Sequence, residues 1–222
     1  MVATLPPSAA DWWSLFGLFL FIGIAAAAIV VGAMVYFALK NRAKKTITFE
    51  SAAGLSRSRA REAVIFASIS AILLFGLAVG SYRMTIDIQN PPPASESLTI
   101  DVTAFQWGFR FHYPENFTTV DECTIPSGKP IIFNVTSSDV MHNFGLHDFK
   151  LKIDAIPGRY NIVWITAPPV TGNDTLTYQI RCYELCGTGH TYMISSLVVM
   201  SPTNYSQWAL QQAQNMNMTG GM

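Results

Sequence analysis

Two cysteines, a histidine and a methionine lie within twelve residues of each other near the end of the chain. They are Cys182, Cys186, His190 and Met193. Glycine and polar residues stand between them, which is typical of a loop. Thiolate, imidazole and thioether together are soft ligands that favour copper over magnesium or calcium. His142, which follows another loop-like stretch, is a candidate for a further ligand.

The spacing leaves several interpretations of this cluster open. A disulfide between Cys182 and Cys186 would give His190 and Met193 no role. Zinc would use the thiols and imidazoles, but methionine is a poor zinc ligand. A single blue-copper ion needs one cysteine, two histidines and a methionine, which leaves one cysteine over. Two thiolates, two imidazoles and a thioether suffice for two copper ions bridged by two sulfurs, which is the interpretation we favour.

The composition restricts the kind of protein that positions this cluster. Of 222 residues, 50% are hydrophobic and only 13% are charged, whereas about 25% charged is usual for a globular chain. This excludes a disordered chain, a nucleic-acid binder and an ordinary cytosolic enzyme. Because the chain has three cysteines, at least one thiol lies outside any internal disulfide.

Two apolar segments account for the missing charge. Residues 12–39 contain no charged residue and as a helix would reach about 42 Å, more than the roughly 30 Å hydrocarbon core of a membrane. Residues 1–11 contain no lysine or arginine, which argues against a cleaved signal peptide and for a short outer segment. Residues 63–82 form the second predicted span.

The segment between the spans fixes their expected orientation. Residues 40–62 carry seven of the 14 basic residues, and basic loops stay on the cytoplasmic side. We therefore expect contact with membrane lipid, a location in the cell membrane, and both termini on its outer side.

The remainder of the chain indicates an all-β outer domain. A proline-rich linker, residues 83–97, leads into residues 98–200, where short apolar or alternating runs are separated by turn residues, as in a β-sandwich or barrel. The runs cover residues 98–105, 130–135, 160–165, 175–180 and 196–200. In the tail, residues 201–222, we expect a short helix around Trp208 followed by disorder that includes Met216 and Met218.

The metal-ligand loop resembles the CuA loop of subunit II of haem–copper oxidases. The matching pattern is Cys182-x-Glu184-x-Cys186-x3-His190-x2-Met193. The resemblance extends to Lys152, Asp154 and Ala-Ile-Pro-Gly-Arg159 after His142, to Gln106-Trp107, and to the order of two spans before the β-domain. It covers essentially residues 12–200 and implies a cupredoxin-like Greek-key fold.

The resemblance also implies the ligand set and the function. Two copper ions would be bridged by Cys182 and Cys186, and the other ligands would be His142, His190, Met193 and the backbone carbonyl of Glu184. The subunit would accept single electrons from an extracytoplasmic carrier and pass them to haem in a separate catalytic subunit I, which reduces O2 to water. The wider complex would contain further oxidase subunits.

Further roles carried over by the resemblance concern single residues. Trp107 would be the electron entry point. The Glu184 carboxylate would bind Mg²⁺ at the contact with the catalytic subunit, where Asp154 and Arg159 would also lie. Glu62, at the inner end of the second span, would mark the entrance of a proton pathway.

Other functions remain open at this point. A CuA-bearing subunit of a nitric-oxide reductase would have a similar electron-entry domain. A stand-alone copper-binding protein on a membrane anchor would leave the stretch from Asp154 to Arg159 without a role. The donor would be a small blue-copper protein or a cytochrome c, which we expect to dock mainly through apolar contacts of Trp107, Phe105, Phe109 and Phe111.

Five Asn-x-Ser/Thr sites lie on the predicted outer side, where such sites accept glycans. They are Asn116, Asn134, Asn173, Asn204 and Asn217, with Asn134 the weakest candidate because it stands in an apolar run. This abundance favours an archaeal cell surface. We expect His112 and His147 to be structural or surface residues, and Cys123 to be a small buried one.

Overall fold

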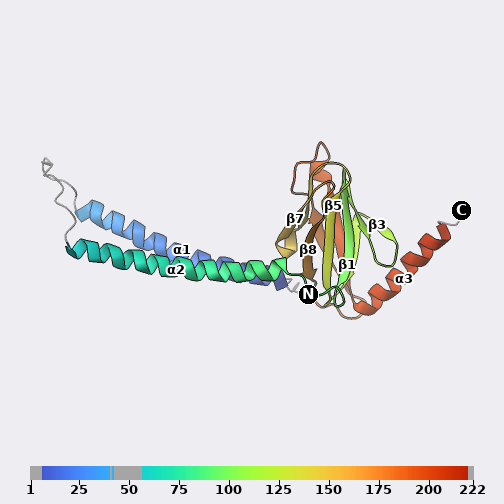
Figure 1. Cartoon of the computed structure of the whole chain (residues 1–222), viewed down its shortest axis with the longest axis horizontal. Helices are drawn as coiled ribbons and strands as arrows, with labels where there is room; N and C mark the ends of the chain where they lie inside the picture. The colour runs from blue at the N-terminus through green and yellow to red at the C-terminus, as the bar shows by residue number, and fades with distance from the viewer. Residues whose placement is uncertain (1–6, 41, 43–56, 220–222) are drawn as a thin grey trace. The chain divides into compact units, whose positions relative to one another are not determined.

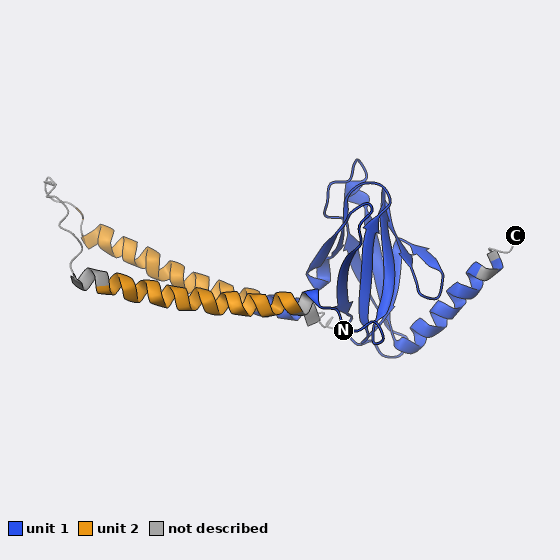
Figure 2. Ribbon diagram, in the orientation of Figure 1, with its two compact units in different colours: residues 1–14, 88–222 blue, residues 15–87 orange. Residues whose placement is uncertain are grey.

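The computed structural model describes residues 7–40, residue 42 and residues 57–219. The chain divides into two compact units, residues 15–87 and residues 1–14 together with 88–222 (Figure 2). The described residues of the first unit are helical except residue 42, and those of the second include two five-stranded sheets and the C-terminal helix.

Two long helices make up the described part of the first unit, and their outer ends extend into the second unit. Helix α1 spans Pro7–Lys40 and α2 spans Arg57–Gln89. Their apolar portions, Ala9–Lys40 and Arg61–Ile86, have mean hydropathies of 2.7 and 2.4 and are not buried inside the protein. By length and composition, both suit a membrane span, whose lipid would cover exposed side chains such as Phe21 and Phe75.

The helices extend beyond the apolar segments. Helix α2 begins at Arg57, so the residues from Arg57 to Glu62, which we expected in the connecting loop, are helical. Arginine, alanine and glutamate favour helix, so the backbone continues past the end of the apolar run. Within the expected basic loop, Lys44 and Lys45 lie outside the described residues.

Two mixed sheets form the outer domain (Figure 1). The first has the strand order β3-β2-β1-β5-β8 and comprises Thr118–Val120, Gly108–His112, Leu98–Phe105, Pro130–Ser137 and Asn161–Thr166. The second has the order β4-β10-β9-β6-β7 and comprises Glu122–Pro126, Ile194–Met200, Thr175–Arg181, His142–Leu146 and Leu151–Ala155. The predicted β-sandwich is thereby confirmed.

Aromatic side chains fill the space between the sheets. Phe144 of β6 contacts the rings of Phe109 and Phe133, with centroids 5.5 and 5.2 Å apart. All three side chains are fully buried. Such large rings anchor their strands firmly, and Phe144 stands two residues after His142. The core therefore holds the strand that carries the first predicted ligand.

The tail contains the predicted helix around Trp208, but this helix is longer than expected. Helix α3 spans Pro202–Thr219, so Met216 and Met218 are helical rather than disordered. Tyr205 and Ala209 are buried, and the ring of Trp208 lies 5.4 Å from those of both Tyr113 and Phe117. Apolar residues three and four apart form one face of a helix, and this face lies around Trp208, where a helix was predicted.

Candidate metal centre

Adjacent strands bring the distant histidine to the cysteine loop. His142 begins β6, and Cys182 directly follows β9. The two strands are antiparallel neighbours, with Gly145 opposite Arg181. The ladder therefore places the start of β6 beside the end of β9. The loop then turns through the 3₁₀ helix η2, His190–Tyr192, and ends at β10.

Every predicted donor atom lies within 4 Å of one of the two loop sulfurs. Cys182 Sγ lies 3.8 Å from Cys186 Sγ, 3.9 Å from His142 Nδ1 and 3.2 Å from the Glu184 carbonyl oxygen. Cys186 Sγ lies 3.5 Å from His190 Nδ1 and 3.8 Å from Met193 Sδ. One compact cluster thus contains all six predicted ligands.

The donor chemistry of this cluster fits copper. Both thiols are free and buried, and the ligand atoms of His142, Cys182 and Cys186 all lie within 4.8 Å of one another. Sulfur and imidazole donors at such distances suit copper, whereas magnesium and calcium require oxygen. The two cysteines do not form the disulfide that was one of the open interpretations.

Burial and the neighbouring Cys182 raise the pKa of Cys186 to about 11. A thiol in this environment stays protonated near neutral pH. A bound cation would have to displace the proton to obtain the thiolate, so metal binding to this cluster is coupled to proton release.

Asp139 is a site residue that the sequence reasoning missed. One of its carboxylate oxygens lies 2.8 Å from His142 Nε2, and the backbone N–H of Gln106 donates to the other at 2.6 Å. Burial opposes ionisation, but the hydrogen bonds from His142, Gln106 and Val140 prevail and lower the pKa of Asp139. With Nε2 engaged, the Nδ1 atom of His142 is directed to the sulfur cluster, a common arrangement for metal-binding histidines. An acid three residues before a histidine gave no distinctive signal.

The turn between β1 and β2 contacts the far end of the ligand loop. Gln106 Nε2 and Trp107 Nε1 both donate to the carbonyl oxygen of Cys186, at 2.8 and 3.1 Å. A Cβ atom on Gly189 would lie 2.3 Å from a Trp107 ring carbon, so the ring rests directly on the Gly189 backbone. Trp107 remains 41% exposed. It therefore contacts both the ligand loop and the solvent.

The apolar surface near the cluster differs from the one we expected. Phe109 and Phe111 are fully buried in the core because they face inward on β2. They are therefore unavailable to a partner, which corrects the expectation from sequence. Exposed apolar side chains instead flank the candidate ligands along the chain: Val140, Met141, Leu185 and Tyr192.

The residues expected at a subunit contact lie on or after β7. Asp154 is exposed and accepts a hydrogen bond from Asn143 Nδ2 at 2.8 Å. Because Asn143 follows His142 and pairs with Asp154 across the β6–β7 ladder, this acid stands beside the ligand strand. Arg159, which follows Gly158, is also exposed. Glu62 lies in α2, where it is exposed.

The remaining predicted residues differ in accessibility. Asn116 and Asn173 are exposed, whereas the amide nitrogens of Asn134 and Asn204 donate to Asp101 and to the Gly172 carbonyl. Asn217 lies in α3. Cys123 is fully buried, as predicted. His112 is exposed and contacts Thr118.

Residues 113–201 match the family model described as "Cytochrome C oxidase subunit II, periplasmic domain". The chain is 35% identical over 212 residues to the heme-copper oxidase subunit 2 of Aeropyrum pernix, covering 90% of this chain and 88% of that protein. It is 29% identical over 211 residues to the probable cytochrome c oxidase subunit 2 of Rickettsia bellii, covering 85% and 74%.

A solved structure shares the fold of the outer domain. The periplasmic domain of cytochrome oxidase subunit II from Bradyrhizobium japonicum superposes with a TM-score of 0.51 and 31% sequence identity. The match covers 57% of this chain and 99% of that structure. Its extent corresponds to a β-domain without the two apolar helices.

Proposed function

Because the chain belongs to the subunit II family of haem–copper oxidases, we propose that its sulfur–histidine cluster is a dinuclear CuA centre through which electrons enter the oxidase. One observation supports this proposal most strongly. Both thiols, both imidazoles, the Met193 thioether and the Glu184 carbonyl lie within 4 Å of a loop sulfur. A mononuclear site would leave one buried thiol without a partner.

Each donor has a distinct role in this proposal. Cys182 and Cys186 would both hold the two copper ions, and His142 and His190 would each bind one of them through Nδ1. Met193 and the Glu184 carbonyl are the weaker ligands. Bound copper would supply one-electron transfer, with no bond of a substrate made or broken in this chain.

The protein around the site limits how far the ligands move when the charge changes. Four of the six donors belong to residues that are at least nine-tenths buried: His142, Cys182, Cys186 and Met193. Cys182 N donates to the Met193 carbonyl at 3.2 Å, which ties the two ends of the loop together. A rigid ligand frame keeps the reorganisation on electron transfer small.

Trp107 is the proposed entry point for electrons. Its indole N–H is bonded to the carbonyl of Cys186, which connects an exposed aromatic ring to a copper ligand through one hydrogen bond. The donor is a small blue-copper protein or a cytochrome c on the outer side of the membrane.

The catalytic chemistry belongs to a separate haem–copper subunit. The cluster would supply single electrons to the haem of that subunit, where O2 would be reduced to water. The Glu184 carboxylate would bind Mg²⁺ at the contact between the two subunits, to which Asp154 and Arg159 would contribute. Glu62 lies at a proton entrance on the inner side.

Copper analysis and EPR spectroscopy of the purified full chain test the proposal. We expect about two copper ions per chain and a mixed-valence signal with hyperfine lines from both nuclei.

Cys182→Ser and Cys186→Ser should abolish the signal because a hydroxyl does not replace a bridging thiolate. Met193→Leu should retain both ions and shift the reduction potential, since a weak thioether ligand tunes it. One copper ion with an ordinary blue-copper spectrum would refute the dinuclear centre.

Purification in mild detergent tests the wider assignment. An oxidase subunit should copurify with haem and with oxygen-consuming activity. A chain that purifies alone would favour the stand-alone copper protein, and a haem complex that reduces nitric oxide but not oxygen would favour the reductase.

A further inference from the structure

Tyr183 stands between two of the proposed copper ligands, Cys182 and Glu184, and its ring lies on the neighbouring strand β6. A Cβ atom on Gly145 would lie 2.2 and 2.3 Å from two carbons of the Tyr183 ring. Any side chain larger than hydrogen at position 145 would therefore displace the ring. The glycine leaves the space that the ring occupies.

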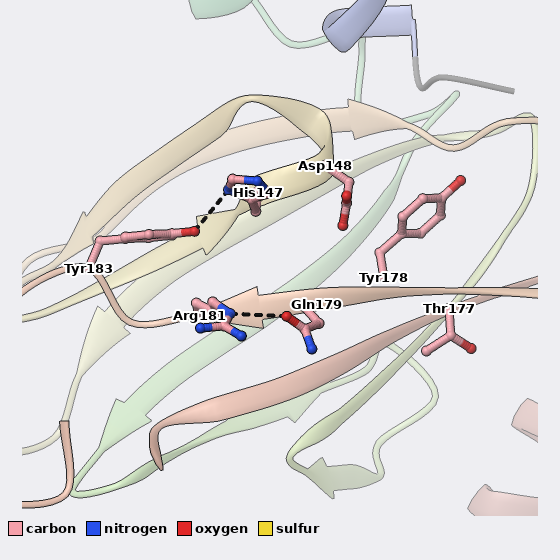
Figure 3. Close-up of a pocket in the computed structure, with 7 residues that line it drawn as sticks. All are labelled: His147, Asp148, Thr177, Tyr178, Gln179, Arg181 and Tyr183. Carbon is pink, nitrogen blue, oxygen red and sulfur yellow. Dashed lines mark hydrogen bonds between the residues drawn. The ribbon is translucent and has the colours of Figure 1, made fainter. Parts of the chain in front are cut away.

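The hydroxyl group fixes the other end of the ring. It lies 3.1 Å from Nδ1 of His147, the first residue of the 3₁₀ helix η1, His147–Phe149 (Figure 3). Both residues line a pocket of about 400 Å³ together with Asp148, Thr177, Tyr178, Gln179 and Arg181. His147 is exposed, as expected of a surface residue, and its ring contacts the ligand loop through Tyr183.

The contacts of Tyr183 with Gly145 and His147 lie where the backbone pairing of β6 with β9 ends. Strands β6 and β9 are joined at two positions, Gly145 with Arg181 and Leu146 with Ile180. Beyond Arg181 the chain leaves the sheet and enters the ligand loop. The ring of Tyr183 crosses back over Gly145 and continues the connection to β6 by side-chain contacts alone.

The two cysteines are consequently held in different ways. The carbonyl of Cys186 accepts hydrogen bonds from Gln106 and Trp107. On the Cys182 side, the adjacent residue Tyr183 is clamped by Gly145 and His147. We call these three residues the Tyr183 clamp.

We propose that Tyr183 is a positioning residue, and that the Tyr183 clamp holds Cys182 and the Glu184 carbonyl against β6. This inference rests on the proposed function for its role at copper. The clamp opposes movement at the Cys182 end of the loop in both the metal-free and the copper-bound chain, and thereby helps to set the reduction potential.

Thiol reactivity of the metal-free full chain tests the clamp without copper. Tyr183→Phe removes the hydroxyl contact and keeps the ring, and is therefore the decisive variant. Gly145→Ala expels the ring and also brings a Cβ atom to 2.9 Å from the Arg181 carbonyl oxygen. One hydrogen bond corresponds to roughly a two- to tenfold change in local opening. We expect Cys182 to be alkylated faster by that factor in Tyr183→Phe, and faster still in Gly145→Ala.

Two controls separate local opening from unfolding. Tyr192→Phe changes an 83% exposed tyrosine of the same loop and should leave the alkylation rate unchanged. Cys123 is fully buried in the core and reports on global unfolding within the same molecule. If Cys123 gained reactivity in parallel with Cys182, or if Tyr183→Phe behaved like Tyr192→Phe, the clamp would be disproved.

A double-mutant cycle tests the pairing with His147. His147→Ala should accelerate alkylation of Cys182 to the same extent as Tyr183→Phe, and the double variant should add nothing further, because both remove one contact. Fully additive effects would show that the two residues act separately and would overturn the proposal.

The copper-loaded chain provides a second readout. Tyr183→Phe should shift the reduction potential and alter the copper hyperfine pattern, while Tyr192→Phe should do neither. Unchanged potential and spectrum in Tyr183→Phe would overturn the positioning role. If the wild-type chain bound no copper pair, the proposed function would fail, yet the alkylation rates would still decide whether the clamp exists.

Discussion

One carboxylate at Asp139 determines which nitrogen of His142 faces the sulfurs. We predict that Asp139→Asn lowers copper affinity about 10- to 100-fold, as is usual when the partner of a metal-binding histidine is removed. Competition with a chelator measures the affinity. Asp174→Asn, at an exposed acid in the turn before β9, is the control. Equal affinities of the two variants would contradict the orienting role.

Cys123 makes the stability of the outer domain sensitive to alkaline pH. Burial raises its pKa from 9.0 to about 12. The neutral thiol is thus favoured in the folded state. Its contribution to the free energy of unfolding is complete below pH 9 and is lost as the pH rises to about 12. At most about 1.4 kcal/mol is lost per pH unit in this interval.

We predict that Cys123→Ala weakens this alkaline loss of stability. Unfolding of the metal-free full chain by denaturant at pH 8, 9, 10 and 11 measures the slope. Wild type should lose stability more steeply above pH 9 than the variant. Parallel curves would show that other groups cause the alkaline unfolding.

At the scale of the elements, the β1–β2 turn and the ligand loop are joined through a ring and a glycine. Gly189→Ala should push Trp107 aside, since the added Cβ would lie 2.3–2.8 Å from three ring atoms. We expect slower electron entry from the donor and a stability loss of about 1–3 kcal/mol, with both copper ions retained. Stopped-flow oxidation of the donor measures the rate.

The exposed neighbour Thr188 gives the matched control. Thr188→Ala should leave the entry rate and the stability close to wild type. If Gly189→Ala also left the rate unchanged, Trp107 would not be the entry point. If it released the copper, the turn would have a structural role at the site instead.

At the scale of the whole molecule, the net charge is too small to steer a partner protein strongly over long range. Residues 90–222 contain ten acidic and six basic side chains, a net charge of −4. Exposed apolar residues, among them Leu185 and Tyr192, flank the candidate ligands. Apolar docking depends weakly on ionic strength, whereas electrostatic steering falls steeply with it.

We therefore predict that the rate of donor oxidation changes only a few-fold between low and high salt. The measurement uses the purified complex and either a blue-copper protein or a cytochrome c as donor. A hundredfold drop would show that charge guides the encounter.

Glycosylation is the second expectation at this scale. Asn116 and Asn173 are exposed, whereas the side-chain amides of Asn134 and Asn204 are engaged in hydrogen bonds. We predict glycan at the first two and little at the second two. Peptide mapping by mass spectrometry on the native protein decides this. An intact mass equal to that of the bare polypeptide would remove the argument for an archaeal surface.

Local pattern in the sequence was sufficient for much of this protein. Two uncharged runs predicted two helices, since a span requires a continuous apolar segment whatever its neighbours are. Turn residues between short apolar runs predicted a β-domain. The spacing from Cys182 to Met193 predicted a metal-binding loop, because all but one of the candidate side-chain ligands lie within twelve residues of each other.

Only the tertiary structure decided which distant residues meet this loop. Asp139, Gly145 and His147 carry no pattern of their own. The contacts of Gly145 and His147 with Tyr183 arise where β6 pairs with β9. Asp139 meets Gln106 because the β1–β2 turn lies beside the segment that leads into β6. Phe109 and Phe111 were expected at the surface because the sequence does not state which face of β2 meets the second sheet. A helix around Trp208 was predicted, but its continuation to Thr219 was not, because the polar residues beyond Ala209 give no helical pattern of their own. Contacts between segments depend on strand order and register, and these are properties of the assembled sandwich.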